Sequence, residues 1–113
     1  MPTNDVSESP EQHLTDHFEG RPGVDKRKAF GRDALTINGK MFVIYRKGSI
    51  VVKLPPETGP KLVREKQAKE FEPSPGRKMK RWFVFGKKVG EERWIEVAEM
   101  SFDYVVAEQE AAG

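Results

Sequence analysis

Two histidines are the first residues whose type and spacing could do chemistry. His13 and His17 are four positions apart, which on a helix places both imidazoles on one face, within reach of a single metal ion. They are the only histidines in the chain, and the segment reads H-L-T-D-H, without the glutamate of the H-E-x-x-H zinc motif. A third ligand would have to be Glu11 or Asp16, and an acidic helix surface explains both of these equally well. We therefore expect solvated helix positions here and no metal site.

The remaining patterns of catalytic residues are missing from the sequence. The chain contains no cysteine, so it has no thiolate nucleophile and no disulfide. None of its five serines lies in a G-x-S-x-G elbow, and neither G-x-x-x-x-G-K nor G-x-G-x-x-G occurs. Most carboxylates of the C-terminal segment fall on one face of a predicted helix, where solvation explains them. We therefore expect a protein that is not an enzyme and binds no cofactor.

The basic segment of residues 77–88 is the part of the sequence that indicates a function most directly. It combines six cations and three aromatic rings with no acidic residue, and could supply both phosphate contacts and stacking surfaces for a nucleic acid. The candidate contact residues are Arg77, Lys78, Lys80, Arg81, Lys87 and Lys88. In the alternative interpretation this is a strand, with Trp82 and Val84 on one face and Phe83 and Phe85 on the other. The rings then belong to the core, with Trp82 as an anchor, and the cations protect the strand from pairing with other chains.

The distribution of charge along the chain helps to decide whether residues 77–88 contact a nucleic acid. The formal net charge is only +2, but residues 20–88 hold nineteen basic and six acidic residues, while residues 1–19 and 89–113 are acidic. If the acidic ends border the basic middle, they cancel its attraction for phosphates. We therefore favour protein contact over nucleic-acid contact, and expect no nucleic-acid affinity tighter than about 10⁻⁴ M near 0.15 M salt.

Length and composition limit the organisation of the chain. With 113 residues, 36% of them hydrophobic, it has the size of one domain with a modest core. The longest apolar run, residues 41–45, is far too short to span a bilayer, and the acidic N-terminus does not resemble a secretory signal. We expect a cytoplasmic protein with no membrane contact, in which residues 1–8 are a flexible tail and residues 9–113 form a single domain.

Three helices are expected to position these residues. Ser9 and Pro10 suit the N-cap and first position of a helix that stops at Gly20. A second helix is expected to begin near Pro60 and to run to about Lys69, because Gly59 and Pro60 are unfavourable inside a helix. The third, residues 91–111, has an acidic ridge on one side and an apolar stripe on the other. On the flank of that stripe, Val97, Met100 and Tyr104 exceed the width that one sheet covers, and mark a possible partner surface.

Strands are predicted between the helices, at about residues 33–37, 41–46, 49–54 and 80–86, with turns at Asn38-Gly39 and Lys47-Gly48. A two-residue turn at Lys47-Gly48 would place three cross-strand pairs on one core face. These pairs are Tyr45 with Ile50, Val43 with Val52, and Met41 with Leu54. The opposite face would then carry Phe42, Ile44 and Val51, which need a cover, either a helix or a partner.

The sequence also resembles a known family, the N-terminal domain of TfoX/Sxy competence regulators and their stand-alone bacterial relatives. The similar stretches are Ala29-Phe30-Gly31, Asn38-Gly39-Lys40, Phe42, Gly48, Lys53-Leu54, Phe71, Pro73, Gly76-Arg77, Met79 and Trp82. The resemblance covers about residues 10–107 and departs from the family pattern at Ala29 and Lys78. Residues 101–106 are also similar to the last helix of MmcQ/YjbR-like proteins, which share the layout and have been likened to DNA-binding folds.

Together these observations predict an α+β domain with an antiparallel five-stranded sheet and three helices, in the order α-β-β-β-α-β-β-α. The expected function is that of a small binding or regulatory module that contacts a partner protein or a second copy of itself. The competing interpretation is a nucleic-acid-binding module that uses the basic 77–88 segment.

Overall fold

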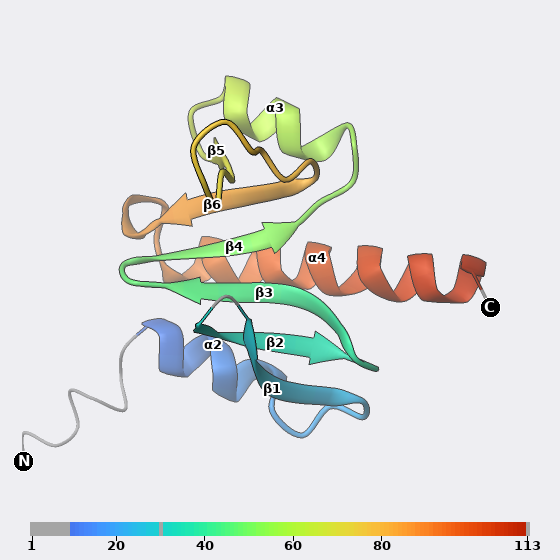
Figure 1. Cartoon of the computed structure of the whole chain (residues 1–113). Helices are drawn as coiled ribbons and strands as arrows, with labels where there is room; N and C mark the ends of the chain where they lie inside the picture. Colours follow the sequence, from blue (N-terminus) through green and yellow to red (C-terminus); the bar gives the residue numbers. More distant parts are fainter. Residues whose placement is uncertain (1–9, 30, 113) are drawn as a thin grey trace, which may run out of the picture.

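The computed structural model describes residues 10–29 and 31–112. Its elements are helix α2 (Pro10–Phe18), strands β1 (Val24–Ala29), β2 (Arg32–Ile37), β3 (Lys40–Arg46) and β4 (Ser49–Lys53), helix α3 (Thr58–Arg64), strands β5 (Lys69–Glu70) and β6 (Trp82–Gly86), the 3-10 turn η1 (Lys87–Val89) and helix α4 (Glu91–Ala112). The six strands form one antiparallel sheet in the order β1-β2-β3-β4-β6-β5 (Figure 1). Strands that follow one another in the sequence are therefore neighbours, except that β6 lies between β4 and β5.

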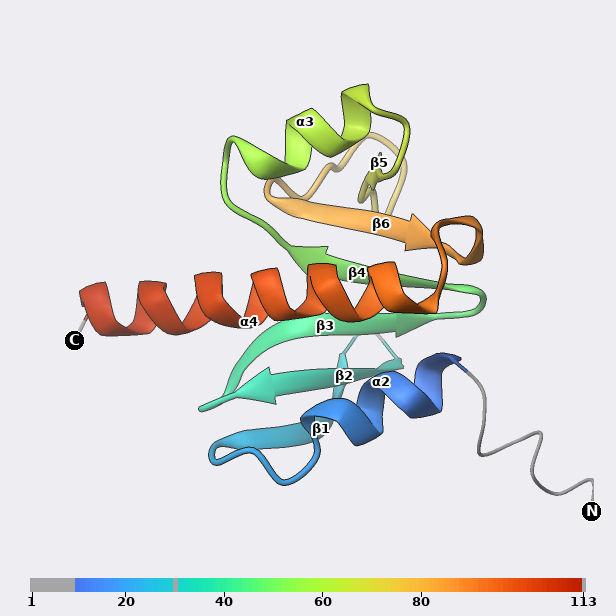
Figure 2. The same ribbon diagram turned by 180° about the vertical axis from the view of Figure 1, so that it is seen from behind.

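Helices α2 and α4 lie on the same face of this sheet, and α3 lies beside β5 and β6 (Figure 2). Between the two helices and the sheet is the larger core, in which Leu14, Phe18, Trp94 and Val97 pack against side chains from β2, β3, β4 and β6. The Trp94 indole Nε1 donates a hydrogen bond of 3.0 Å to the carbonyl oxygen of Gly86. The start of α4 is thus fixed to the end of β6.

The sheet has six strands, so the prediction of five was wrong in number, although the α+β class, the antiparallel pairing and the three helices are confirmed. Strand β1 was missed because residues 25–28 are four consecutive charged residues, without the apolar alternation that indicates a half-buried strand. It lies at one side of the sheet and pairs with β2 alone. The predicted order has two strands between the second and third helices, and β5 and β6 take these places, although Lys69, the first residue of β5, was assigned to the end of the second helix.

A β-bulge in β3 reverses two expected side-chain positions. Leu35 pairs with Val43 and Thr36 pairs with Met41, so Phe42 is an extra residue on β3. Phe42 therefore joins the core beneath the helices, whereas Met41 packs on the opposite face. The prediction from the sequence, with Met41 in the core and Phe42 on the opposite face, was wrong because strict alternation does not hold through this bulge.

The second face of the sheet is covered by the chain itself. Ala34, Ile44 and Val51 form a smaller core there with Phe71 and Trp82. Trp82 is only 8% exposed, on the same face as Val84, while Phe83 and Phe85 belong to the larger core. The predicted alternation of this strand is confirmed, and the cover is the segment that joins β5 to β6 rather than a helix.

The helix boundaries differ from expectation mainly at α3. It begins at Thr58, includes Gly59 and Pro60, and ends at Arg64, well before the expected end near residue 69. Ser9, expected as the N-cap of α2, and the expected tail of residues 1–8 lie outside the described residues. In the part of the chain that is described, none of the helices has the length and apolar character needed to cross a membrane.

Candidate functional site: two pockets at opposite ends of the sheet

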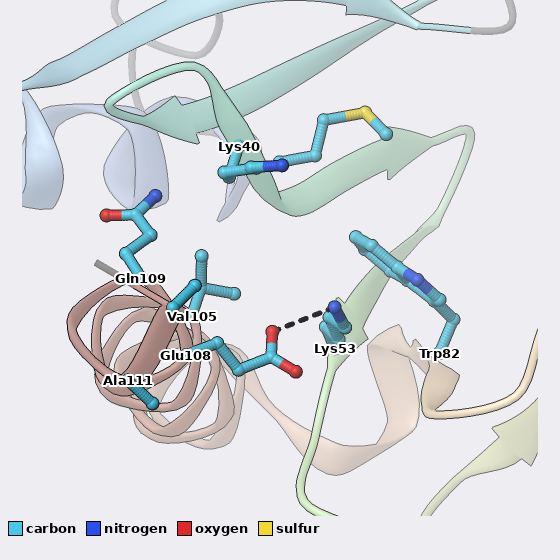
Figure 3. A pocket seen from close by; sticks show the side chains of 9 residues that line it. Lys40, Lys53, Trp82, Val105, Glu108, Gln109 and Ala111 are labelled. Atoms are coloured by element: carbon cyan, nitrogen blue, oxygen red, sulfur yellow. Dashed lines mark hydrogen bonds and ion pairs between the residues drawn. The ribbon is translucent and has the colours of Figure 1, made fainter.

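The first pocket, here called the C-terminal groove, lies where the last turns of α4 pass the start of β3, the end of β4 and the start of β6 (Figure 3). Its volume is about 670 Å³. The lining residues are Lys40, Met41, Lys53, Trp82, Val105, Glu108, Gln109, Ala111 and Ala112. The groove therefore combines apolar walls with a few charged side chains.

The charges of the C-terminal groove are held in a small network. The Lys53 Nζ atom lies 2.9 Å from Glu108 Oε1 (Figure 3). An Arg81 guanidinium nitrogen lies 3.9 Å from the other carboxylate oxygen of Glu108. The same Arg81 nitrogen donates to the Tyr104 hydroxyl over 3.3 Å. The hydrogen bond from Lys53 is the main cause that lowers the pKa of Glu108. Glu108 is consequently an anion that holds two cations at one wall of the groove.

Arg81 reaches this network through an unusual backbone conformation. Its φ of 74° lies in the left-handed region, which normally favours glycine. The Trp82 amide donates to the Met79 carbonyl over 3.2 Å and closes the turn, while the Arg81 carbonyl accepts from the Leu54 amide over 2.7 Å. This turn places the Arg81 side chain beside the groove and directs the Trp82 ring into it.

The second pocket, here called the cationic pocket, lies at the other end of the same three strands. It has a volume of about 990 Å³ and includes the end of β3, the start of β4, the end of β6, and parts of β5 and η1. Five cations line it: Arg46, Lys66, Lys69, Lys87 and Lys88. The acidic side chains in its lining are Glu70 and Glu72. The excess of cations gives this end of the sheet a positive field.

The six cations predicted for nucleic-acid contact do not form one patch. Lys87 and Lys88 line the cationic pocket, whereas Arg81 belongs to the network at the opposite end of β6. Lys78 forms an ion pair of 2.8 Å with Glu70, and this hydrogen bond raises the pKa of Lys78. The other two, Arg77 and Lys80, are exposed on the loop before β6.

Three of the five cations in the cationic pocket were not predicted from the sequence. Arg46, Lys66 and Lys69 come from β3, from the residues after α3, and from β5. They are separated in the sequence by other elements, and no local pattern connects them. Only the strand order, with β6 inserted between β4 and β5, brings them together with Lys87 and Lys88.

The predicted partner surface on α4 needs one correction. Val97 is fully buried in the larger core, so it cannot contact a partner. Met100 is half-buried and packs against the same core. Tyr104 is also half-buried, and its ring centroid lies 6.0 Å from Lys53 Nζ. Of the three residues, Tyr104 is the one that contacts the charged network of the C-terminal groove.

The two histidines contact different carboxylates of α4. His13 Nδ1 is hydrogen-bonded to Glu91, and His17 Nε2 lies 2.7 Å from Glu99 Oε2. Each histidine therefore connects α2 to α4. Across residues 10–29 and 31–112, no group of three or more His, Cys, Asp or Glu side chains is placed to hold a metal ion.

The architecture is that of a small α+β domain, with one antiparallel sheet, two helices on one face and a pocket at each end of the central strands. The family model of the TfoX N-terminal domain matches residues 16–104, which is most of the chain. The chain therefore belongs to the TfoX N-terminal domain family, as its resemblance indicated, and this membership suggests a small regulatory module. Searches of curated proteins and of solved structures give no match.

Proposed function

We propose that this TfoX N-terminal domain is a regulatory module that acts by binding a partner protein at the C-terminal groove. The observation that carries the proposal is the composition of the groove, in which apolar side chains of three elements lie together with charged ones. Protein interfaces likewise combine apolar surface with polar and charged side chains. The groove also lies beside Tyr104, one of the residues expected to face a partner.

The lining of the groove indicates the chemistry of the partner segment. Met41, Trp82 and Val105 offer an apolar surface to which a partner can add an aliphatic or aromatic side chain. Lys40 is exposed at the same pocket and forms no ion pair within the described residues. Lys53, in contrast, is already neutralised by Glu108. The matching segment therefore carries an apolar anchor with a carboxylate near it.

The experiment uses two positions on α4 that differ in their relation to the groove. Ala111 lines the groove, whereas Ala107 is exposed on the same helix and does not. A photo-crosslinking amino acid at position 111 should give a discrete adduct in cells, which mass spectrometry then identifies. The same amino acid at position 107 should not give that adduct.

Binding of the captured protein is then measured with purified components. Ala111→Arg places a charged, bulky side chain in the groove and should weaken binding at least about tenfold, while Ala107→Arg should leave the affinity unchanged. Sedimentation of the chain alone distinguishes a second copy from a different partner. Equal adducts from both positions, or equal affinities of both arginine variants, would contradict the proposal.

A further inference from the structure

We propose that the cationic pocket binds a small ligand that carries consecutive phosphate groups, such as a nucleoside triphosphate or an inorganic polyphosphate. This site is separate from the C-terminal groove, because the two pockets lie at opposite ends of β3, β4 and β6. The inference therefore stands or fails independently of the partner-binding proposal.

The lining of the cationic pocket has an excess of positive charge. None of its five cations forms an ion pair within the described residues, so all five remain available to an anion. The two acids in the lining are already engaged. Glu70 is paired with Lys78 at 2.8 Å, and Glu72 Oε2 accepts a hydrogen bond of 2.6 Å from the Gly76 amide. The field in the pocket is therefore strongly positive despite these carboxylates.

The acids at the start of α4, which follow directly on η1, are also largely occupied. Glu91 is hydrogen-bonded to His13, and Glu96 Oε1 accepts from Arg93 over 2.9 Å. Glu92 is exposed and lines a separate hollow with Val89 and Gly90. Because this hollow shares Val89 with the cationic pocket, Glu92 is close enough to offset part of the positive charge, but one carboxylate leaves an excess of the five cations.

The volume of the pocket suits a small-molecule ligand. A volume of about 990 Å³ is at the upper end of the range usual for small-molecule sites, roughly 300–1,000 Å³. The four lysines are exposed, and their ammonium groups are point charges on flexible stems, which suit a chain of phosphates better than one planar carboxylate. Arg46 comes from β3 and is half-buried, with its guanidinium carbon 5.6 Å from the centroid of the Phe71 ring, so it is the more fixed donor.

The backbone of Lys66 provides an independent argument. Lys66 has φ 64°, in the left-handed region, and is the second residue after the end of α3. Its amide donates to the Val63 carbonyl over 3.0 Å, and the Gln67 amide donates to the Leu62 carbonyl over 2.9 Å. This pair of bonds is the Schellman motif, in which the left-handed position usually holds glycine. Lys66 occupies a position at which glycine would be free of strain, and its side chain contributes to the cationic pocket.

The aromatic residues argue against a nucleic acid as the ligand. Proteins that bind single strands stack bases on exposed rings. Trp82, Phe83 and Phe85 are 8%, 6% and 0% exposed, and none of them lines the cationic pocket. The pocket therefore offers charge for phosphates but no aromatic surface for bases.

Isothermal titration calorimetry of the whole chain tests the proposal with defined probes. Tripolyphosphate and adenosine triphosphate should each bind with a dissociation constant below about 1 mM at 50 mM salt, and more weakly at 200 mM salt. Equal affinities for the two probes would identify the phosphate chain as the ligand. Tighter binding of adenosine triphosphate than of tripolyphosphate would identify a nucleoside polyphosphate. No heat from either probe would overturn the proposal. Binding of duplex DNA that tripolyphosphate fails to displace would also overturn it, in favour of a nucleic-acid surface.

Variants locate the bound probe. Lys66→Ala and Lys69→Ala should each weaken tripolyphosphate binding, up to about fivefold. Lys61→Ala is the matched control, since Lys61 is an exposed lysine of α3 outside the pocket, and it should leave the affinity unchanged. Equal losses in all three variants would show diffuse attraction and overturn the site.

Lys66→Gly separates binding from folding. Because glycine removes the backbone strain, this variant should unfold at a higher temperature than the wild type and yet bind tripolyphosphate more weakly. A merely structural role of Lys66 would not reduce binding in a more stable protein. Unchanged affinity of this variant would remove Lys66 from the site and overturn the argument from its backbone.

Discussion

Arg21 binds both carboxylate oxygens of Glu99, with nitrogen–oxygen distances of 3.0 and 2.7 Å. The same guanidinium group lies 4.6 Å from the centroid of the Phe18 ring and 4.9 Å from that of Phe102. His17 adds a third contact to Glu99. The residues that follow α2 are thereby fixed to the middle of α4 by paired hydrogen bonds and by cation–π contacts.

This ion pair predicts a pH-dependent contribution to stability. Hydrogen bonding to Arg21 is the main cause that lowers the pKa of Glu99 to about 2. Because the folded-state pKa is lowered, the contribution is fully present above the unfolded value near 4.5 and is lost as the pH falls towards 2. Glu99 is about one-third exposed, so solvent screening reduces the effect to about 1–2 kcal/mol.

Urea unfolding of Glu99→Gln at several pH values measures this contribution. The variant should be less stable than the wild type at pH 7, and the difference should shrink between pH 4.5 and pH 2. Glu110→Gln is a suitable control, because Glu110 is exposed and forms no ion pair among the described residues. A difference between Glu99→Gln and wild type that is the same at pH 7 and pH 2 would contradict the assignment.

We expect the small side chain of Ser101 to make a large contribution to the free energy of unfolding. It is fully buried, and its hydroxyl donates to the Phe42 carbonyl over 2.7 Å and accepts from the Lys53 amide over 3.0 Å. Ser101→Ala would leave both backbone groups without this partner, at a cost of about 2–3 kcal/mol in the free energy of unfolding. Ser74→Ala, at an exposed serine, should be nearly neutral. Chemical denaturation distinguishes the two, and similar midpoints would show that water replaces the lost bonds.

At Gly59 we expect alanine to destabilise the protein, although replacing a helix glycine by alanine is usually stabilising. In an exposed helix, Gly→Ala stabilises by about 1 kcal/mol. A methyl group at Gly59 would instead meet ring atoms of Phe83 at 2.1 and 2.2 Å, and Phe83 is buried. Gly59→Ala should therefore destabilise by about 1–3 kcal/mol.

A double-mutant cycle checks this cause. If the Phe83 ring is responsible, adding Gly59→Ala to a Phe83→Leu background should cost clearly less than adding it to the wild type. A stabilising effect of Gly59→Ala alone would show that α3 does not approach β6 this closely.

We expect removal of the Trp82 side chain to destabilise the smaller core of the sheet. Its ring is 8% exposed and packs with Ala34, Ile44, Val51 and Phe71 on the second face of the sheet. Trp82→Ala should lower the free energy of unfolding by roughly 3–5 kcal/mol. Thermal unfolding measures it, and Lys80→Ala, at an exposed residue of the preceding loop, serves as the control. A melting temperature near that of wild type would place the ring on the surface.

Strands and helices could be predicted from the sequence where their apolar residues recur with one regular spacing. The alternation from Trp82 to Phe85 is predictable because the strand is buried on both faces. Helix α4 is predictable from its long apolar stripe, and it ends within one residue of the expected end. Strand β1 has no apolar period, because its side chains between Val24 and Ala29 are all charged. Its pairing depends on the backbone of β2 rather than on burial of its own side chains.

The pockets could not be predicted in the same way. Phe42 and Met41 exchange faces because of a bulge that depends on the pairing partner and not on β3 alone. The C-terminal groove needs that exchange, since it places Met41 beside Trp82. The cationic pocket depends on tertiary proximity of cations such as Arg46 and Lys87, whose positions in the sequence are 41 residues apart.

The strand order has a consequence for the kinetics of folding. Strands β1 to β4 pair with their sequence neighbours, so each step closes only a short loop, whereas β6 can join β4 only after residues 54–81 have been brought back to the sheet. Long loop closure and late-forming contacts slow folding. We expect amide protection in β2, β3 and β4 to appear before protection in β6 in pulse-labelling experiments. Because β6 contributes to the lining of both pockets, the protein would then acquire its two binding sites only in the last stage of folding.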